Sequence, residues 1–277
     1  MKSSDARLPI RDAVILMAGI GSRLRVNGAT LAKPLIPVLG RPLISHTLEA
    51  LARAGIKNVY AIVGFESDFV MAQTRPLIPP GLNVEFLRNA EWKKQNGVSV
   101  LIAAPRVTAP FLLTMSDHLF DDALINTLLG QAMAGEINLA VDRKIDSVFD
   151  LDDATKVQTS GDRIVTIGKS LTTYDAIDSG MFVCTTSIFD YLERARTDGD
   201  CSLTEGVRLA AGEGKARAID IEQAWWQDVD TPEMLAQAEE RLRTRSGRGD
   251  SGQSQACAGD RGPQMQNPLR QTDQREN

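Results

Sequence analysis

The sequence predicts an α/β fold: a mixed, mostly parallel sheet with helices on both faces, plus a small β-rich subregion. Short apolar runs alternate with helical segments in the first half of the chain, and shorter, more polar strand patterns follow. With 277 residues, of which 43% are hydrophobic, the chain is long enough to bury a large core. One substantial domain is therefore expected.

The apolar runs predict the strands of a Rossmann-like sheet. They are residues 13–17, 59–63, 84–87, 111–115 and 138–141. Between the first two runs, the apolar side chains of residues 43–55 fall on one helical face, and Gly55 suits the end of a helix. This segment is expected to form a helix packed on the sheet.

The pattern of the chain changes after Asp142. Shorter and more polar strands are predicted at residues 156–158, 164–167 and 181–183. We therefore divide the domain into a first half at about residues 10–142 and a β-rich part at about residues 143–184.

Helical patterns return at residues 187–195, 203–211 and 232–242. Thr231 and Pro232 give the last helix an N-cap and a proline at its first position. From about residue 244 the chain has almost no bulky apolar side chain, and such a composition cannot offset the entropy lost on ordering. We predict one domain at residues 1–243 and a disordered polar tail at residues 244–277.

A glycine-rich turn follows the first predicted strand. Its residues Gly19 and Gly21 allow backbone N–H groups to approach phosphate oxygens without a Cβ atom in the way. Arg23 and Lys33 add positive charge close behind. Turns after buried strands also favour glycine for steric reasons alone, but the two cations favour a site for a nucleoside triphosphate.

Two familiar phosphate-binding motifs do not match this turn. A dinucleotide fingerprint needs a third small residue where this chain has Leu24, and an acid about twenty residues further on, where residues 38–42 are basic. A P-loop would need a Gly-Lys-Ser or Gly-Lys-Thr sequence, which the turn lacks. A dehydrogenase is therefore disfavoured.

Carboxylates follow two strand-like segments. Asp117 comes directly after the run at residues 111–115, and alternation places Asp228 and Asp230 on one side of an extended segment. Taken singly, each acid suits a turn or a helix cap. Together with the cationic turn they predict a Mg²⁺ site, because Mg²⁺ takes one or two carboxylates and completes its shell with water and phosphate.

Composition excludes several other classes of protein. The net charge of −5 argues against a general nucleic-acid binder. The three cysteines have no metal-like spacing and suit reduced thiols. Neither a signal peptide nor an apolar run of membrane-spanning length is present, so we expect a cytoplasmic protein that is not membrane-embedded.

These motifs, in this order, resemble the nucleotidyltransferase family with the glycosyltransferase-A-like fold. The matching segments are MAGIGSR at 17–23, KPL at 33–35, GRPLI at 40–44, NGVS at 96–99, SDH at 116–118 and WQDVDTP at 226–232. Within that family, the segments at 140–144, 152–157, 167–169 and 174–180 most resemble the CTP:inositol-1-phosphate cytidylyltransferase branch.

The resemblance implies transfer of CMP from CTP to inositol 1-phosphate with Mg²⁺, giving CDP-inositol and pyrophosphate. It implies Arg23 and Lys33 as catalytic cations and Asp117, Asp228 and Asp230 as metal-ligating acids. The implied nucleotide contacts are Met17, Ala18, Gly19, Ile20, Gly21, Ser22, Asn96, Gly97 and Ser99.

For the acceptor phosphate we nominate Lys169, with Arg143, Lys144 and Lys156 as further candidates, although lysines at strand ends are usually solvated. Asp178 and Gly180 are also expected to contact the acceptor. Residues 10–142 are therefore called the nucleotide half, and residues 143–184 the acceptor-binding part.

The known bifunctional inositol enzymes carry a membrane-embedded synthase after the cytidylyltransferase, whereas this chain continues into a polar tail. The resemblance therefore implies a separate membrane-bound CDP-alcohol phosphotransferase downstream. No general base is expected, because the attacking phosphate, with a second pKa of about 6, is already largely ionised at neutral pH. We interpret His46 and His118 as structural, with His118 orienting Asp117.

Three other acceptors and one non-catalytic function remain open at this stage. Phosphocholine or 2-aminoethylphosphonate could replace it as acceptor, although a quaternary ammonium favours an aromatic cage and this chain has few aromatic residues. Another sugar phosphate is a further alternative. A catalytically silent nucleotide-binding regulator would have lost a metal acid or Lys33, and all of these residues are present.

Overall fold

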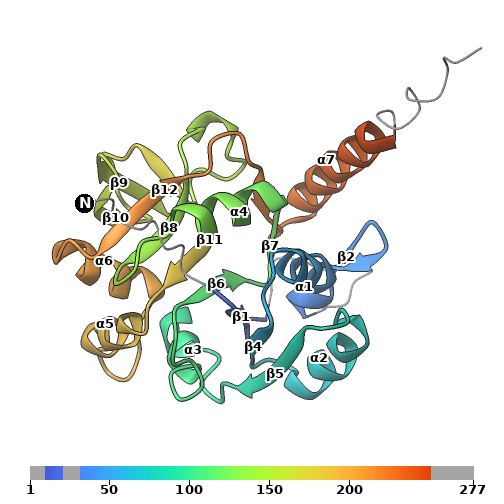
Figure 1. The fold of residues 1–277 in the computed structure, drawn as a ribbon, viewed down its shortest axis with the longest axis horizontal. Helices are drawn as coiled ribbons and strands as arrows, with labels where there is room; N and C mark the ends of the chain where they lie inside the picture. Colours follow the sequence, from blue (N-terminus) through green and yellow to red (C-terminus); the bar gives the residue numbers. More distant parts are fainter. Residues whose placement is uncertain (1–9, 21–31, 251–277) are drawn as a thin grey trace, which may run out of the picture. The chain divides into compact units, whose positions relative to one another are not determined.

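The computed structural model describes residues 10–20 and 32–250, with side chains as far as Arg245 (Figure 1). The chain divides into two units, residues 1–239 and residues 240–277. The first unit holds the whole nine-stranded sheet.

A nine-stranded mixed sheet organises this unit, in the order β5-β4-β1-β6-β11-β8-β12-β10-β9. Parallel pairs join β1 to β4 and β6, β4 to β5, and β8 to β12. The strand β11 runs antiparallel to β6 and β8. The bounds are β1 Asp12–Met17, β4 Asn58–Val63, β5 Asn83–Arg88, β6 Phe111–Met115, β8 Ile137–Asp142, β9 Lys156–Ser160, β10 Arg163–Gly168, β11 Ala176–Cys184 and β12 Ala216–Asp220.

All five apolar runs predicted as strands form strands of this sheet, and the predicted helix at 43–55 forms α1. The helices are α1 Leu43–Arg53, α2 Ser67–Thr74, α3 Asn96–Ile102, α4 Asp122–Gln131, α5 Ser187–Ala195, α6 Leu203–Gly212 and α7 Pro232–Asp250. The prediction of a mixed, mostly parallel α/β sheet is therefore confirmed.

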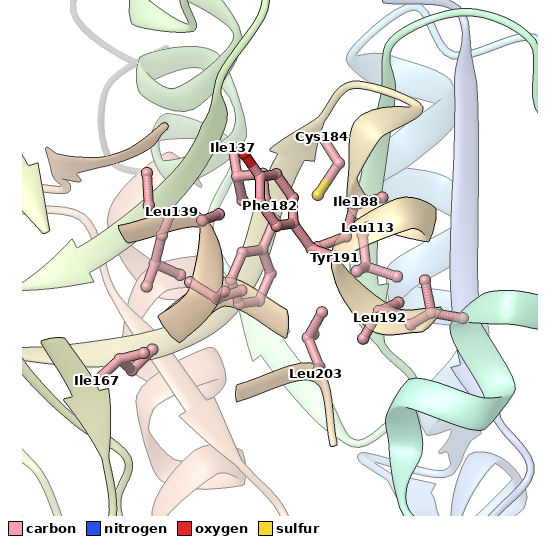
Figure 2. Packing of buried hydrophobic residues seen from close by; sticks show 14 of the residues in the cluster. Leu113, Ile137, Leu139, Ile167, Phe182, Cys184, Ile188, Tyr191, Leu192 and Leu203 are labelled. Atoms are coloured by element: carbon pink, nitrogen blue, oxygen red, sulfur yellow. The ribbon is translucent and has the colours of Figure 1, made fainter. Parts of the chain in front are cut away.

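Helices cover both faces of the sheet because side chains along β1 alternate between two cores. Val14 and Leu16 belong to a cluster with residues of α3, α5 and α6, whereas Ala13, Ile15 and Met17 belong to a cluster with residues of α1, α2 and α4. Figure 2 shows part of the first cluster, where Phe182 of β11 lies among side chains of β6, β8, α5 and α6.

The β-rich part extends this sheet. Its strands β9 and β10 form a hairpin that turns at Gly161, and it joins the sheet through β9–β11 and β10–β12 pairs. The strand β11 begins at Ala176, earlier than the predicted strand at 181–183, and β12 was not predicted. The helix α7 continues to Asp250, so its end lies beyond the tail boundary predicted at residue 244.

Short elements at the carboxyl ends of β1 and β6 complete the fold. They are the 3₁₀-helix η1 Lys33–Leu35, the hairpin of β2 Pro37–Val38 with β3 Arg41–Pro42, and the ribbon of β7 His118–Phe120 with β13 Trp226–Asp228. Within the residues that the structure describes, no helix is both long and apolar enough to span a bilayer.

Candidate active site

The ribbon of β7 and β13 brings together acids that are far apart in the sequence. Its antiparallel register places Asp228 opposite His118. The ladder continues next to this pair, because the N–H of Val229, which follows Asp228, donates to the carbonyl of Asp117, which precedes His118, at 2.8 Å. The carboxylates that follow β6 and end β13 therefore lie side by side, as the sequence predicts for a shared site.

Lys33 lies between two of these acids. Its Nζ donates to Asp117 Oδ2 at 2.6 Å and forms an ion pair with Asp230. Burial alone would lower the pKa of Lys33, but the two carboxylates outweigh burial and raise it. Burial alone would raise the pKa of Asp117, because it disfavours the charged carboxylate. Lys33 and His118 outweigh burial and hold this pKa well below its usual range. Lys33 and Asp117 are therefore both charged at neutral pH.

His118 holds the other oxygen of Asp117. Its Nδ1–H donates to Asp117 Oδ1 at 2.7 Å, as expected for an orienting residue. The imidazole stacks on Trp226, with ring centroids 5.8 Å apart and planes inclined by 11°. Trp226 is held in turn, because its Nε1–H donates to Asp142 Oδ2 at 3.0 Å. These contacts fix the orientation of the Asp117 carboxylate.

Gly180 gives His118 the space it needs. Its φ of +76° lies in the left-handed region, and a Cβ atom there would lie 2.5 Å from His118 Nε2. The Gly180 N–H donates to Asp178 Oδ1 at 2.7 Å. Burial raises the pKa of Asp178 to about 6. The predicted acceptor residues Asp178 and Gly180 therefore lie against the imidazole that orients Asp117.

A cavity of about 280 Å³ joins these residues to the β-rich part. The predicted site residues that line it are Asn96, Asp117, Lys169, Asp178, Asp228 and Asp230. Candidates from the nucleotide half and from the acceptor-binding part thus meet at one cavity.

Three of the predicted acceptor residues are held away from this cavity. Arg143 pairs with Asp175 and donates to Thr159 Oγ1 at 3.1 Å. Lys144 Nζ reaches Asp142 Oδ1 at 2.8 Å, and Lys156 is buried with its Nζ donating to the Asp152 carbonyl at 2.9 Å. Lysines and arginines near strand ends find local partners, so sequence position alone did not separate them from Lys169.

Of the three predicted nucleotide-binding residues on α3, one lines the cavity and two do not. Asn96 lines the cavity, but Ser99 is buried and its Oγ accepts a hydrogen bond from Asn89 Nδ2 at 3.0 Å. Gly97 packs against Cys201, whose carbonyl oxygen would lie 2.6 Å from a Cβ atom at this position. In this structure Gly97 and Ser99 therefore serve to pack α3 rather than to line the cavity.

The predicted phosphate-binding turn is described only in its first part. Met17 and Ala18 are buried, and Met17 belongs to the core on the α1 side of the sheet. Gly19 and Ile20 follow, and a Cβ atom at Gly19 would have nothing within 4 Å. Gly21, Ser22 and Arg23, which were predicted to hold phosphate, lie outside the described residues.

Several cavity residues were given no binding role from the sequence, although Asp153 and Thr155 lie in the segment at 152–157 that resembles the inositol branch. Asp150, Asp153 and Thr155 line it from the loop before β9, and Thr204 lines it from the first turn of α6. Asp153 Oδ1 accepts a hydrogen bond from Lys169 Nζ at 2.6 Å. The acidic residues at 150–153 could have indicated a site in the sequence. Their closeness to the other site residues depends on the pairing of β9 with β11, which the sequence alone did not predict.

The carboxylates of Asp117 and Asp228 fit a Mg²⁺ ion that is bound partly by protein and partly by substrate phosphates. Asp117 and Asp228 line one cavity, and no residue in the described ranges donates a hydrogen bond to the Asp228 carboxylate. Burial raises the pKa of Asp228, and the neighbouring Asp230 and Asp117 raise it further. No group of three or more His, Cys, Asp or Glu residues forms a metal cage in the described ranges. Two carboxylates with water and phosphate are nevertheless enough for Mg²⁺.

Residues 13–199 match the model of the MobA-like NTP transferase domain. The chain belongs to this family. The protein is therefore a nucleotidyltransferase, as the ordered motifs around Lys33 and Asp117 predict.

Two curated relatives share much of this chain. The "Bifunctional IPC transferase and DIPP synthase" of Aquifex aeolicus (strain VF5) is 33% identical over 237 residues, which cover 84% of this chain and 52% of that protein. The protein of the same name from Thermococcus kodakarensis is 35% identical over 232 residues, covering 83% and 50%. The nucleotidyltransferase spans about half the length of these relatives.

A solved structure supports the same family. The inositol-1-phosphate CTP transferase from T. maritima aligns with a TM-score of 0.76 and 25% sequence identity, over 90% of this chain and 98% of that chain. The predicted glycosyltransferase-A-like nucleotidyltransferase fold is thereby confirmed.

Proposed function

We propose that this nucleotidyltransferase transfers CMP from CTP to inositol 1-phosphate in a Mg²⁺-dependent reaction, forming CDP-inositol and pyrophosphate. The observation that carries the proposal is that Asp117, which pairs with Lys33, lines one cavity together with Asp228 and Lys169. The names of the two relatives and of the similar solved structure support CTP and inositol 1-phosphate as the substrates.

The reaction requires alignment and charge neutralisation more than proton transfer. An oxygen of the acceptor phosphate attacks the α-phosphorus of CTP, and the bond from that phosphorus to the departing pyrophosphate breaks. Since the second pKa of a phosphate monoester is about 6, the attacking oxygen carries its charge without a general base. The work left to the protein is to hold two anions in line against their repulsion.

Lys33 and the two acids would share this work. The Lys33 amine is already held between the carboxylates of Asp117 and Asp230, which line the cavity, and it would exchange one of them for an α-phosphate oxygen of CTP. Asp117 and Asp228 would hold Mg²⁺, which supplies divalent charge to neutralise the triphosphate. His118 keeps Asp117 in the orientation that this requires.

Lys169 would receive the acceptor phosphate. It lines the cavity from the β-rich part, and its side chain is 61% exposed while it pairs with Asp153 at 2.6 Å. An exposed ion pair of this kind contributes little to stability, roughly 0–1 kcal/mol, so a phosphate can compete for the amine at small cost. A positive charge from the β-rich part is thus available in the cavity that Asp117 and Asp228 also line.

The cavity lining disfavours a quaternary ammonium acceptor such as phosphocholine. Trp226 is the one aromatic side chain among the described residues that line it, and its ring already stacks on His118. An aromatic cage needs several ring faces around the cation. A polyol phosphate therefore remains the favoured acceptor, and 2-aminoethylphosphonate is kept as the alternative for the assay.

The deciding experiment measures pyrophosphate release. The purified protein is incubated with Mg²⁺, each of the four nucleoside triphosphates and, in turn, inositol 1-phosphate, phosphocholine and 2-aminoethylphosphonate. CTP with inositol 1-phosphate is expected to give the highest kcat/KM. A preference for another pair would replace the proposed substrates, and no release with any pair would refute the proposed reaction.

A further inference from the structure

Asp142, the last residue of β8, is a buried carboxylate that the proposed reaction does not use. Its side chain is 5% exposed, and both of its oxygens have hydrogen-bond donors. The N–H and the ammonium of Lys144 each lie 2.8 Å from Oδ1, and the Trp226 Nε1–H donates to Oδ2 at 3.0 Å. Burial of a carboxylate is costly unless such partners compensate it. Lys144 and Trp226 therefore allow this carboxylate its buried position.

Lys144 also reaches the turn between β12 and β13. Its Nζ donates to the Glu222 carbonyl at 2.5 Å, and the Ile221 N–H donates to the Val141 carbonyl at 3.0 Å. These two bonds hold the turn against the end of β8, and β13 begins shortly after it, at Trp226. Lys144 thus joins the carboxylate that holds Trp226 to the turn from which Trp226 emerges.

The backbone of this turn depends on its contacts. Glu222 has a φ of +52°, a left-handed conformation that residues other than glycine rarely adopt. Such a conformation persists only where the surrounding structure holds it. At Glu222 the N–H donates to Asp220 Oδ1 at 2.8 Å, and the carbonyl accepts the Lys144 ammonium. Loss of that ammonium would remove one of these two contacts and loosen the start of β13.

A short path leads from Trp226 to the acids at the cavity. The Trp226 ring stacks on the His118 imidazole, and His118 donates to Asp117 Oδ1. Asp228 ends the same three-residue strand that Trp226 begins. A displacement of Trp226 would therefore disturb the orientation of both Asp117 and Asp228.

Lys144 differs from Lys169 in what its release would cost. Lys169 is 61% exposed and pairs with an exposed carboxylate, so a substrate phosphate can compete for it. Lys144 is 34% exposed, and its ammonium is shared between the buried Asp142 and the Glu222 carbonyl. A phosphate that drew Lys144 away would leave Asp142 buried without its cation. These contacts favour a fixed role for Lys144 over the acceptor contact predicted from the sequence.

We infer that Lys144 is a positioning residue: through Asp142 and Trp226 it fixes the ribbon of β7 and β13 that carries the acids of the site. The inference rests on the proposed function, in which Asp117 and Asp228 hold Mg²⁺. Lys144 would act without touching either substrate. Its loss should therefore weaken the use of Mg²⁺ and leave acceptor binding intact.

Single variants and one double variant separate positioning from acceptor binding. Lys144→Met removes the ammonium, and Lys144→Arg keeps a cation that can donate to both the carboxylate and the carbonyl. Trp226→Phe keeps a ring beside His118 but removes the N–H. Lys215→Met is the control, because Lys215 is an exposed lysine directly before β12, at the other end of that strand from the Glu222 turn. The double variant combines Lys144→Met with Trp226→Phe.

Lys144→Met is expected to raise the Mg²⁺ concentration for half-maximal rate about threefold to tenfold and to lower kcat by a similar factor. This is less than the roughly 10–100-fold loss typical of a residue that contacts a metal ligand directly. The KM for inositol 1-phosphate should change by less than about twofold, and Lys144→Arg should recover most of both losses. In the Trp226→Phe background, Lys144→Met should have a smaller effect, because side chains that act along one path are not additive.

Near-ultraviolet circular dichroism follows the tryptophan ring without any turnover. The contribution of Trp226 is the difference between each protein and the same protein carrying Trp226→Phe. We expect this contribution to shrink in Lys144→Met and to keep its wild-type size in Lys144→Arg and Lys215→Met. A loss of stability that did not release Trp226 would leave the signal unchanged at a temperature well below unfolding.

A rise in the KM for inositol 1-phosphate alone would make Lys144 an acceptor ligand and would overturn the inference. An unchanged Trp226 signal in Lys144→Met, additive effects in the double variant, or equal effects in Lys215→Met would also overturn it, while the proposed function stands. No turnover of inositol 1-phosphate by the wild-type protein would refute the proposed function instead. The circular dichroism would still decide whether Lys144 holds Trp226.

Discussion

The Lys33 side chain combines two properties that a transferase needs. It is 17% exposed and lies between the carboxylates of Asp117 and Asp230, so its charge is held in place before any substrate arrives. A preorganised charge at a partly buried position stabilises developing negative charge more strongly than a mobile, hydrated one. The sequence indicates Lys33 as a phosphate ligand, but not its carboxylate partners, because those contacts depend on the pairing of β7 with β13.

Lys33→Met should lower kcat by about 100-fold or more, because a positive charge directed at the reacting phosphate is lost. The protein should remain folded, with a loss of about 1–3 kcal/mol because Asp117 and Asp230 each lose their ion pair with Lys33, against a typical total stability of about 5–15 kcal/mol. Steady-state kinetics and urea unfolding measure the two effects. Lys57→Met, at an exposed position, is the control. Unchanged turnover in Lys33→Met would refute the role of the amine.

Asp178 should reduce stability at neutral pH because its pKa is raised to about 6. The folded state then binds a proton more tightly than the unfolded state, so the free energy of unfolding falls as the pH rises from about 4 to about 6. Asp178→Asn is therefore expected to be more stable than the wild-type protein by on the order of 1–3 kcal/mol at pH 7.5, with a smaller difference at pH 4.5. Urea unfolding at both pH values measures this. A pH-independent difference would contradict the shifted pKa.

At the scale of elements, the long strands could be predicted and the short ones could not. The apolar runs at 13–17 and 111–115 have enough hydrocarbon to be buried in any α/β arrangement, and both form strands. The strands β7 and β13 span three residues each, and their pairing depends on the fold of everything between them. The sequence predicted the acids of the site because they follow strand ends, where α/β sheets bind their ligands. It did not predict the contacts that depend on the short strands.

The strand β11 has a bulge between Asp178 and Phe182, and this bulge requires glycine at residue 180 for two separate reasons. Gly180→Ala would place a Cβ atom 2.5 Å from His118 Nε2 and would also strain the backbone at a φ of +76°. Gly135→Ala is a matched control, because Gly135 has a φ of +78° and nothing within 4 Å of the added atom. We expect a loss of about 1 kcal/mol in the control and about 2–4 kcal/mol in Gly180→Ala.

Kinetics should separate these two glycine variants further. Displacement of His118 in Gly180→Ala would release the Asp117 carboxylate, so kcat should fall at least tenfold and the Mg²⁺ concentration for half-maximal rate should rise. Gly135→Ala should retain the wild-type kcat and Mg²⁺ dependence. Equal behaviour of the two variants in urea unfolding and in the Mg²⁺ titration would mean that the contact with His118 has no consequence.

At the scale of the whole molecule, the candidate site joins three distant parts of the chain. Lys33 follows β1, Asp117 follows β6, and Asp228 ends β13, while β1 and β6 are neighbours in the sheet. The early and middle segments are thus brought together by parallel pairing, and the late segment is brought to them by the ribbon. A ligand that binds at all three would oppose the unfolding of each, because it binds only the assembled state.

Mg²⁺ with CTP should therefore stabilise the fold in a way that depends on Asp228. At a nucleotide concentration about 100 times its Kd, the free energy of unfolding should rise by about 2.7 kcal/mol, and EDTA should remove most of that rise. In Asp228→Asn the Mg²⁺-dependent part should shrink, because one of the two carboxylates proposed to hold Mg²⁺ is missing. Asp190→Asn, an exposed acid on α5, serves as the control and should show the wild-type increase. Differential scanning fluorimetry with Mg²⁺, with EDTA and without CTP measures these differences without any turnover. An equal Mg²⁺-dependent increase in Asp228→Asn and in the wild-type protein would show that Asp228 does not bind the metal.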